Sequence, residues 1–410
     1  MFKFEFENYE ISDGNLDRAL NSLLDKDLGF YNLVDRKDEH KNIKDFASSV
    51  DSKFDHIIVL GIGGSALGIK TIRDTLIVRK DRDKLRVIDN VDPDFIYENT
   101  QDLDLSRTMF VVITKSGGTS ETMSLFMNMK KAVIEKGLKY SDHFVFLTDP
   151  ENGLLREIAK RDKITTFDVP QNVGGRYSVL SAVGLVPAAL AGVDIDGLIN
   201  GAIEMRNILL NDYESINLCY QMAEFQSAHH KAGININVLF PYSNKLKRFG
   251  DWYTQLLAES IGKNSEVGLT PITALGSTDQ HSQLQLYSDG PDDKIYQFIK
   301  VDKFENNTEI AVDMEDDLIA DKFDFLEGVG FAELLNTALK GTMDSLKERN
   351  RPMMQITLDE VNAVNLGGLF MLYEGATALL GELLNVDSFN QPGVERSKVL
   401  TKEYLENKNA

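Results

Sequence analysis

The stretch His56–Gly68, HIIVLGIGGSALG, determines how the surrounding chain is organised. Four apolar residues, Ile57 to Leu60, predict a short buried strand, and the glycines that follow allow a tight turn that brings backbone N–H groups close to a ligand. We expect a helix to begin near Ser65, and its amino end would direct free N–H groups and a partial positive charge to the same place. The stretch therefore predicts a loop that binds an anion.

The glycine pattern does not by itself identify the anion. Gly61, Gly63 and Ala66 satisfy the dinucleotide fingerprint G-x-G-x-x-G/A, and Asp89 stands where an acidic residue could bind a ribose. A sugar-phosphate site and an ordinary strand-to-helix turn fit the same residues. These three interpretations stay open at this point.

A second candidate loop, TKSGGTSET at residues 114–122, follows the apolar run Met109–Thr114. Its hydroxyls and glycine N–H groups are neutral donors suited to phosphate oxygens, and Lys115 adds a positive charge. On its own, the loop could equally be a flexible turn capped by Thr119 or Ser120. Because ligands of an open parallel sheet bind at the carboxyl ends of its strands, the two loops can converge on one anion. A dinucleotide fold needs only the first loop, so the pair favours a phosphorylated sugar.

Short apolar runs alternate with helix-length amphipathic segments, which is typical of parallel sheets covered on both faces. The sequence thus predicts an α/β protein with two αβα sandwich domains and parallel sheets. We expect strands of the first sheet at 57–60, 85–88, 109–114 and 144–148, and of the second at 236–240, 270–275, 296–301 and 354–358. The expected organisation is a helical N-terminal segment at 1–54, a first domain at 55–193, a helical bridge at 194–232, a second domain at 233–388 and a C-terminal arm at 389–410.

Composition narrows the classes of function. The 410 residues suffice for two domains, and the formal net charge of −20 disfavours non-specific binding to nucleic acid, whose phosphates would be repelled. A small anionic substrate would need a locally positive pocket. Cys219 is the single cysteine, which excludes an intramolecular disulfide and suits the cytoplasm. We expect no secretory signal, and we interpret the apolar stretch Val361–Leu384 as a buried packing or interface helix rather than a membrane span.

Several motifs together resemble those of the phosphoglucose isomerase family. GIGGSALG and TKSGGTSET are similar to the phosphate loops of the sugar-isomerase (SIS) domain, and further similar stretches are NVGGRYSVLSAVG at 172–184, ESIGK at 259–263, DQHSQLQL at 279–286 and FNQPGVERSK at 389–398. The matches span residues 61 to 398. The resemblance implies two SIS-type domains, no metal or other cofactor, and reversible isomerisation of glucose 6-phosphate and fructose 6-phosphate through a cis-enediol, a step of glycolysis and gluconeogenesis.

The resemblance also implies roles for particular residues. Glu259 would be the base that removes a proton from C2, and Arg176 would stabilise the enediolate with a permanent charge. His281 and Lys398 would open the sugar ring; because the family takes this histidine from a neighbouring subunit, the enzyme would be a homodimer with a shared site. Substrate-binding roles are implied for Gly64, Ser65, Lys115, Ser116, Thr119, Gln255 and Gln391.

Each of these positions also has an ordinary structural interpretation. From the residues alone, Glu259 could be an exposed helical carboxylate, Arg176 a surface arginine in a turn, and Lys398 one more charge on a tail helix. Two other functions stay open: a non-catalytic SIS module that senses sugar phosphates, and an isomerase that also accepts mannose 6-phosphate. The first would need the loops but not the four candidate catalytic residues together. An aminotransferring SIS enzyme is disfavoured, because the chain begins Met-Phe-Lys and lacks the cysteine nucleophile of a glutaminase domain.

Overall fold

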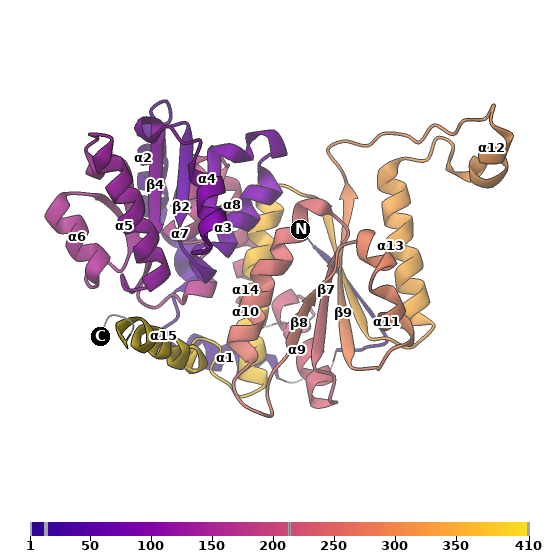
Figure 1. Ribbon diagram of the computed structural model, residues 1–410. Coiled ribbons are helices and arrows are strands. Elements are labelled where there is room, and N and C mark those ends of the chain that lie inside the picture. Colours follow the sequence, from indigo (N-terminus) through magenta and orange to yellow (C-terminus); the bar gives the residue numbers. More distant parts are fainter. Residues whose placement is uncertain (1, 12–14, 212, 214, 408–410) are drawn as a thin grey trace.

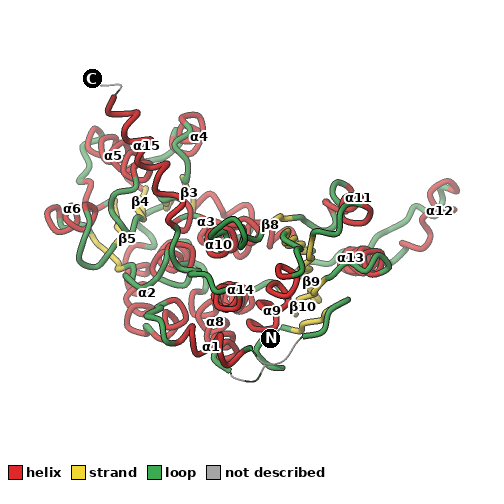
Figure 2. Tube along the Cα trace, turned by 90° about the horizontal axis from the view of Figure 1, so that it is seen from below, coloured by secondary structure: helices red, strands yellow, loops and turns green. Residues whose placement is uncertain are grey.

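The computed structural model describes residues 2–11, 15–211, 213 and 215–407. Parts of the predicted segments 1–54, 194–232 and 389–410 therefore lie outside the described residues. The chain forms two five-stranded sheets, each packed against helices (Figure 1 and Figure 2). In Figure 1 the first sheet lies in the indigo to violet part of the molecule and the second sheet mainly in the pink to orange part.

The helices alternate with the strands through most of the chain. Those of the first half are α1 Leu16–Leu24, α2 Lys37–Val50, α3 Leu67–Leu76, α4 Pro93–Thr100, α5 Ser120–Glu135, α6 Leu154–Asp162 and α7 Ala182–Leu190. Those of the second half are α8 Ile195–Leu209, α9 Leu218–Lys231, α10 Lys247–Ile261, α11 Leu284–Asp289, α12 Asp317–Phe323, α13 Phe331–Lys347, α14 Ala363–Leu383 and α15 Glu395–Asn407.

The first sheet has the order β3-β2-β4-β5-β6, and all of its strands are parallel. Ile57 and Val59 of β2 enter one core with α3 and α7, whereas Ile58 and Leu60 enter another with α5 and α6. A strand buried on both faces has to be apolar throughout, which explains the continuous apolar runs. The strands are β2 His56–Leu60, β3 Leu85–Ile88, β4 Thr108–Ile113, β5 Phe144–Thr148 and β6 Thr165–Asp168.

The second sheet has the order β1-β10-β9-β7-β8 and is mixed. Its four parallel strands occur where the apolar runs predict them: β7 Ile236–Pro241, β8 Thr270–Thr273, β9 Lys294–Lys303 and β10 Met353–Glu360. The fifth, β1 Lys3–Glu7, pairs antiparallel with β10 at the sheet edge. The N-terminal segment, which was expected to be helical, therefore contains a strand before its helices. Its sequence, KFEFE, alternates apolar and charged residues, which is the pattern of a half-buried edge strand.

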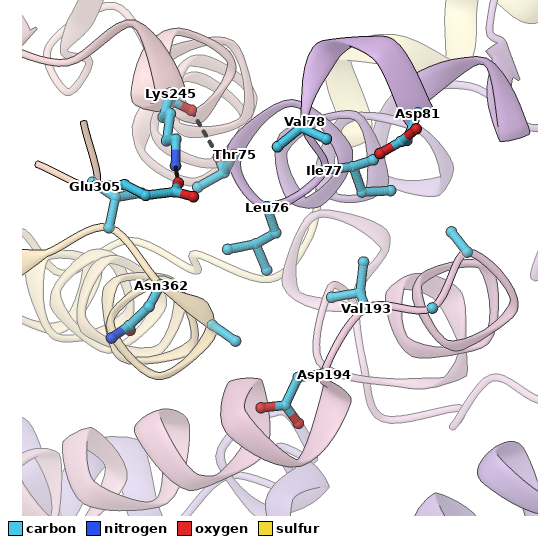
Figure 3. Close-up of a pocket in the computed structure, with 14 residues that line it drawn as sticks. Thr75, Leu76, Ile77, Val78, Asp81, Val193, Asp194, Lys245, Glu305 and Asn362 are labelled. Carbon is cyan, nitrogen blue, oxygen red and sulfur yellow. Dashed lines mark hydrogen bonds and ion pairs between the residues drawn. The ribbon is translucent and has the colours of Figure 1, made fainter.

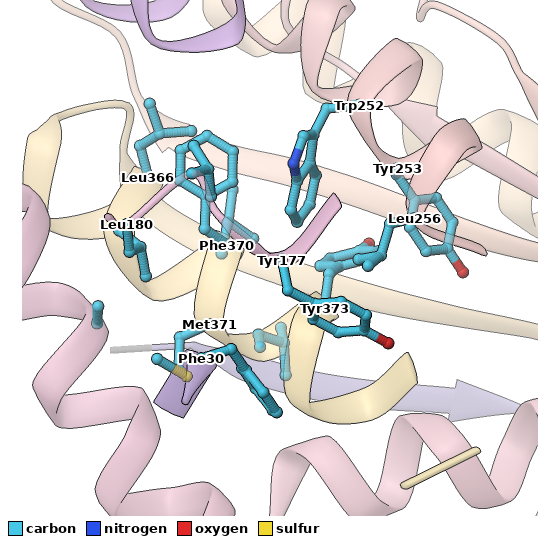
Figure 4. Packing of buried hydrophobic residues seen from close by; sticks show 14 of the residues in the cluster. Phe30, Tyr177, Leu180, Trp252, Tyr253, Leu256, Leu366, Phe370, Met371 and Tyr373 are labelled. Carbon is cyan, nitrogen blue, oxygen red and sulfur yellow. The ribbon is translucent and has the colours of Figure 1, made fainter. Parts of the chain in front are cut away.

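The largest apolar core lies between the two sheets and includes strand residues from both, such as Val59 and Ile299. Aromatic and aliphatic side chains of α10 and α14 fill its centre (Figure 4). Helix α14 is long and apolar enough to cross a membrane by length and composition, but 89% of its most apolar window is buried inside the protein. It packs against α8 and α9. The interpretation of Val361–Leu384 as a buried packing helix is confirmed.

Two segments extend from the body of the protein. The excursion between β9 and α13 carries α12, which projects at the upper right of Figure 1. Several of its apolar side chains are exposed, including Leu318, Phe323 and Phe325. Near the C-terminus, α15 has no buried residue and carries Lys398. Both segments thus offer side chains that the single chain leaves uncovered.

Helix α14 also contains an unusual buried acid, Glu374. Its side chain is 0% exposed, and neither carboxyl oxygen has a hydrogen-bond partner among the described residues. Burial raises the pKa of Glu374 well above its ordinary value, because a charged carboxylate is poorly solvated there. The folded protein therefore holds this group in its neutral, protonated form.

Replacement of Glu374 by glutamine should change how stability depends on pH. The folded pKa is raised, so the wild-type protein loses stability from this group as the pH rises above the unfolded-state pKa, whereas Glu374→Gln has no proton to lose. We expect the stability of the variant relative to wild type to increase as the pH rises above the unfolded-state pKa of about 4.3. Urea unfolding at several pH values measures this difference. A difference that does not vary with pH would contradict a neutral Glu374.

Candidate active site

The first predicted loop turns tightly at the end of β2. A short 3-10 turn covers Gly63–Ser65, and α3 begins at Leu67, close to the expected start near Ser65. Gly63 has a φ of 58°, a conformation that favours glycine. A Cβ added to Gly64 would lie 2.2 Å from the carbonyl oxygen of Gly175, so a glycine is required for this close approach. The loop therefore lies directly against the backbone that carries Arg176.

The hydroxyl loop, residues 114–119, follows β4 of the same sheet. Because β2 and β4 are parallel neighbours, both loops lie at one edge of the sheet. The side-chain oxygens of Thr114 and Thr119 are 3.1 Å apart, within hydrogen-bond distance. Ser116 is exposed, and its hydroxyl accepts a hydrogen bond of 3.3 Å from the N–H of Gly118. The loop thus presents hydroxyls and N–H groups, the neutral donors that phosphate oxygens accept.

Arg176 is a buried cation with only 2% of its surface exposed. Its Nε donates a hydrogen bond of 2.7 Å to the hydroxyl of Ser260. Its terminal nitrogens donate to the carbonyl oxygens of Ser388 and Asn390 and to Oε1 of Gln391. A buried guanidinium needs such acceptors to offset its lost hydration, and here they fix the group in one position.

Glu259 faces Arg176 from helix α10. Its Oε2 lies 3.4 Å from Nη1 of Arg176, and the Glu259 side chain keeps 29% of its surface exposed. One turn earlier, Gln255 donates from Nε2 to Oε1 of Glu259 over 3.0 Å. A Cβ on Gly63 would lie 3.0 Å from the same Nε2. The structure therefore brings Glu259, Arg176 and Gln255 together with the first loop.

Behind the arginine lies a rigid apolar support. Tyr177 packs against Phe30 and Phe389, with ring centroids 5.2 and 5.1 Å away. Its hydroxyl lies 3.2 Å from that of Ser260, the residue that accepts from Arg176. Burial raises the pKa of Tyr177, so its hydroxyl stays protonated. Figure 4 shows Tyr177 and Phe30 within the cluster of buried side chains, which limits the movement of the Arg176 backbone.

Lys115 was expected to supply charge to a phosphate, but its ammonium has other partners in the structure. Nζ donates to the carbonyl oxygen of Gln171 over 2.6 Å and to that of Val173 over 3.1 Å. Burial lowers the pKa of Lys115, and the nearby carboxylate of Asp149 acts in the opposite direction. Its side chain thus connects the hydroxyl loop to the segment that leads to Arg176.

The two predicted ring-opening residues are not brought to Arg176 and Glu259 within this chain. His281 ends the short turn Thr278–His281 and is exposed. Lys398 is also exposed and forms an ion pair of 2.8 Å with Glu395 of the same helix, α15. The cluster formed by the single chain therefore contains Arg176 and Glu259 of the four predicted catalytic residues.

Four residues that hold the site together were not singled out from the sequence. Ser260, Ser388 and Asn390 accept hydrogen bonds from Arg176. Lys263 donates to the carbonyl oxygen of Glu259 over 2.7 Å and also to Asn390, so it fastens the 388–391 loop to α10. Burial and the charge of Arg176 lower the pKa of Lys263. Ser260, Lys263 and Asn390 lie inside the ESIGK and FNQPG stretches. These motifs were the only features of the sequence that could have pointed to the three residues.

A separate cavity lies at the other end of α3 (Figure 3). It has a volume of about 520 Å³, and none of the predicted site residues lines it. Its walls include Asp81 and Asp194, and Lys245 and Glu305 form an ion pair of 3.0 Å on one side of it. An anionic ligand would meet mostly acidic groups there. The cluster around Arg176, in contrast, is rich in hydrogen-bond donors.

The cluster around Arg176 can perform a defined kind of chemistry. A fixed guanidinium can stabilise an enediolate while the carboxylate beside it moves a proton, and the neighbouring loops can hold a phosphate. The fold and the site thus define an SIS-type sugar-phosphate isomerase. More narrowly, the chain belongs to the phosphoglucose isomerase family: the model described as "Phosphoglucose isomerase" matches residues 33–410.

Related proteins match over most of their length. The chain is 39% identical to a glucose-6-phosphate isomerase of Carboxydothermus hydrogenoformans, with 93% of this chain and 87% of that protein covered. It is 35% identical to a probable glucose-6-phosphate isomerase of Methanococcus maripaludis, with 97% and 91% covered.

Solved structures agree with the fold. A hypothetical protein from Thermus thermophilus superposes with a TM-score of 0.87 at 32% identity, covering 95% of this chain and 94% of that one. A glucose-6-phosphate isomerase from Chlamydia trachomatis gives a TM-score of 0.84 over 100% of this chain and 89% of that one. Its sequence identity is 21%, so this likeness supports the architecture alone.

Alanine at position 64 should disrupt the site without unfolding the protein. Because its Cβ would lie 2.2 Å from the carbonyl oxygen of Gly175, the loop carrying Arg176 has to move. We expect Gly64→Ala to lose about 100-fold in isomerase kcat, the cost of a displacement of about 1 Å. The matched control is Gly341→Ala, because a Cβ there meets no atom within 4 Å. Equal kcat values for the two variants, measured alongside thermal unfolding, would contradict the tight loop contact.

Proposed function

We propose that this chain interconverts glucose 6-phosphate and fructose 6-phosphate, a step of glycolysis and gluconeogenesis. The observation that carries the proposal is the pairing of buried Arg176 with partly exposed Glu259 beside the two candidate phosphate loops. Membership of the phosphoglucose isomerase family and the names of the relatives described above support the choice of substrates. We further propose that the enzyme acts in the cytoplasm, which is supported by its free and buried Cys219.

The substrate phosphate would bind at the edge of the first sheet. The proposed donors are the N–H of Gly64 and the hydroxyls of Ser65, Ser116 and Thr119, all from the two strand-end loops. Gln255 would add a side-chain amide next to Gly63. Because β2 and β4 are neighbouring parallel strands, the donors of the two loops would surround one position rather than two.

Proton transfer would take place at the other end of the bound sugar. In the proposed mechanism Glu259 removes the proton from C2 of the open-chain aldose and returns it to C1, while the hydroxyl proton moves from O2 to O1 of the enediolate, which forms the ketose. Arg176 would stabilise the negative charge that develops on the enediolate oxygens, and its acceptors keep it in place during the reaction. Gln391, which accepts a hydrogen bond from Arg176, would contact the sugar near this end.

Ring opening is assigned to His281 and Lys398, and this assignment requires a homodimer. We propose that His281 enters the site of a second copy of the chain, whereas Lys398 approaches its own site when α15 moves. His281 is exposed and lies outside the Arg176 cluster, which is consistent with use by a neighbour. The exposed apolar residues Leu318 and Phe325 near α12 offer a surface that a second copy could cover.

Incubation of fructose 6-phosphate with the protein in heavy water tests the reaction directly. We expect an aldose 6-phosphate to appear with deuterium at C2, because the enediol intermediate exchanges its proton with solvent through Glu259. NMR distinguishes glucose 6-phosphate from mannose 6-phosphate. Deuterium in mannose 6-phosphate would show that the isomerase also accepts the mannose epimer. Binding without any turnover would instead favour the non-catalytic sensing module.

In the same assay Glu259→Gln should lose about 10²- to 10⁴-fold in kcat, because an amide cannot accept the proton. The fructose 6-phosphate affinity, measured by calorimetry, should change little because the phosphate contacts remain. The matched control is Glu266→Gln, which removes an exposed carboxylate in the loop after α10. Similar kcat values for the two variants would remove Glu259 as the base.

Mixing two inactive variants tests whether the site is shared. Glu259→Gln and His281→Ala chains, each carrying a different tag, are unfolded together, refolded and purified through both tags. In a mixed dimer one of the two sites would combine an intact Glu259 with an intact His281, so about half of the wild-type activity should return. Mixed dimers that form but stay inactive would contradict a site shared between subunits.

A further inference from the structure

The segment 171–176 lies between the two predicted phosphate loops. On one side, Gly64 of the first loop touches the carbonyl oxygen of Gly175, where an added Cβ would approach to 2.2 Å. On the other side, Lys115 of the hydroxyl loop donates to the carbonyl oxygens of Gln171 and Val173. Arg176 follows only three residues after Val173. The position of the arginine therefore depends on contacts with both loops.

Lys115 is the centre of a wider set of contacts among the loops that follow β4, β5 and β6. Its own carbonyl oxygen accepts a hydrogen bond of 3.2 Å from the N–H of Asp149, after β5. Asp149 Oδ1 in turn accepts from the side chain of Gln171 over 3.3 Å. Three successive strand-end loops are thus held together by Lys115, Asp149 and Gln171.

The ammonium of Lys115 donates hydrogen bonds to backbone carbonyl oxygens, rather than pointing to the hydroxyls of its own loop. An ammonium has three donors, and the carbonyl oxygens at 2.6 and 3.1 Å take two of them. In and next to this segment, the N–H groups of Val173, Tyr177 and Ser178 donate to the carbonyl oxygens of Pro170, Gly174 and Gly175, at 3.2, 3.0 and 3.3 Å. The segment is therefore a compact turn that Lys115 fastens from outside.

We propose that Lys115 is a positioning residue for the isomerisation: through the carbonyl oxygens of Gln171 and Val173 it holds the 171–176 segment, and with it Arg176, in the reactive position. Its side chain then acts on the enediolate through Arg176 and makes no direct contact with the phosphate. This inference rests on the proposed function, because it assigns Arg176 to the enediolate. It also explains why a lysine within a phosphate loop has its charged end directed to a neighbouring loop.

Lys115→Met separates positioning from phosphate binding, because methionine keeps much of the length of the stem and removes the donors. We expect kcat for fructose 6-phosphate to fall about 10- to 100-fold, whereas the inhibition constant of inorganic phosphate changes by less than about threefold. Ser116→Ala, on the same loop, should show the opposite pattern, with an inhibition constant raised about tenfold. Lys131→Met, at an exposed lysine of α5, is the control for loss of a surface charge.

Hydrogen exchange provides a measurement that does not depend on turnover. In Lys115→Met the N–H groups of Val173, Tyr177 and Ser178 should exchange at least about tenfold faster than in wild type, whereas those of β2 should be unchanged. If Lys115→Met does not fold, Lys115→Gln replaces it, because glutamine keeps a donor group without the charge. In Lys115→Gln the exchange should also be faster and kcat also lower than in wild type, but both changes should be smaller than in Lys115→Met.

Two results would overturn the proposal. One is an inhibition constant of phosphate that rises about tenfold or more in Lys115→Met while kcat is preserved, because the lysine would then bind phosphate directly. The other is unchanged exchange in the 173–178 segment, because the lysine would then not hold it. A failure of the proposed function is distinguishable from both, since it appears as an absence of turnover in the wild-type protein.

Discussion

The site depends on the burial of one positive charge, that of Arg176. A guanidinium withdrawn from water is tolerated only where acceptors replace its hydration, and those acceptors come from two distant parts of the chain. Ser260 lies on α10, whereas Ser388, Asn390 and Gln391 belong to the loop before α15. The arginine therefore connects the segment after the first sheet to α10 and to the 388–391 loop. A rearrangement of any of these would leave a buried charge without its partners.

Close backbone packing makes this arrangement possible. The first loop and the Arg176 segment approach at Gly64 and Gly175 to a distance that excludes any side chain at position 64. In the proposed mechanism phosphate and enediolate lie at opposite ends of one sugar, so the spacing between the two loops and Arg176 would have to match the length of the substrate. The glycine at position 64, which lets the first loop approach this backbone, thus also sets the position of Arg176.

The sequence predicted those features of the structure that depend on residues close together in the chain. Seven of the eight strands predicted from apolar runs are largely buried, and the eighth, β8, is a partly covered edge strand. The edge strands β1 and β6 are also only partly covered, and they were missed. Arg176 and Glu259 were found because each lies within a short characteristic motif. The partners of Arg176 could not be found in this way: Ser388 lies 212 residues further along the chain. Lys115 and Gln171, which are 56 residues apart, meet only because β4 and β6 belong to one sheet.

The protein has a formal net charge of −20, yet its proposed substrate is an anion. The hydrogen-bond partners of individual arginine and lysine side chains explain how both can hold. Arg86, in β3, lies between the carboxylates of Asp83 and Asp102, which neutralise it. Arg176 and Lys263 instead donate mainly to neutral carbonyl, amide and hydroxyl oxygens. Such oxygens fix the position of a cation without cancelling its charge, and the carboxylate of Glu259 lies further from Arg176, at 3.4 Å. A strongly acidic protein can thus keep a local positive charge for an anionic ligand, because most of the acceptors around Arg176 are dipoles rather than anions.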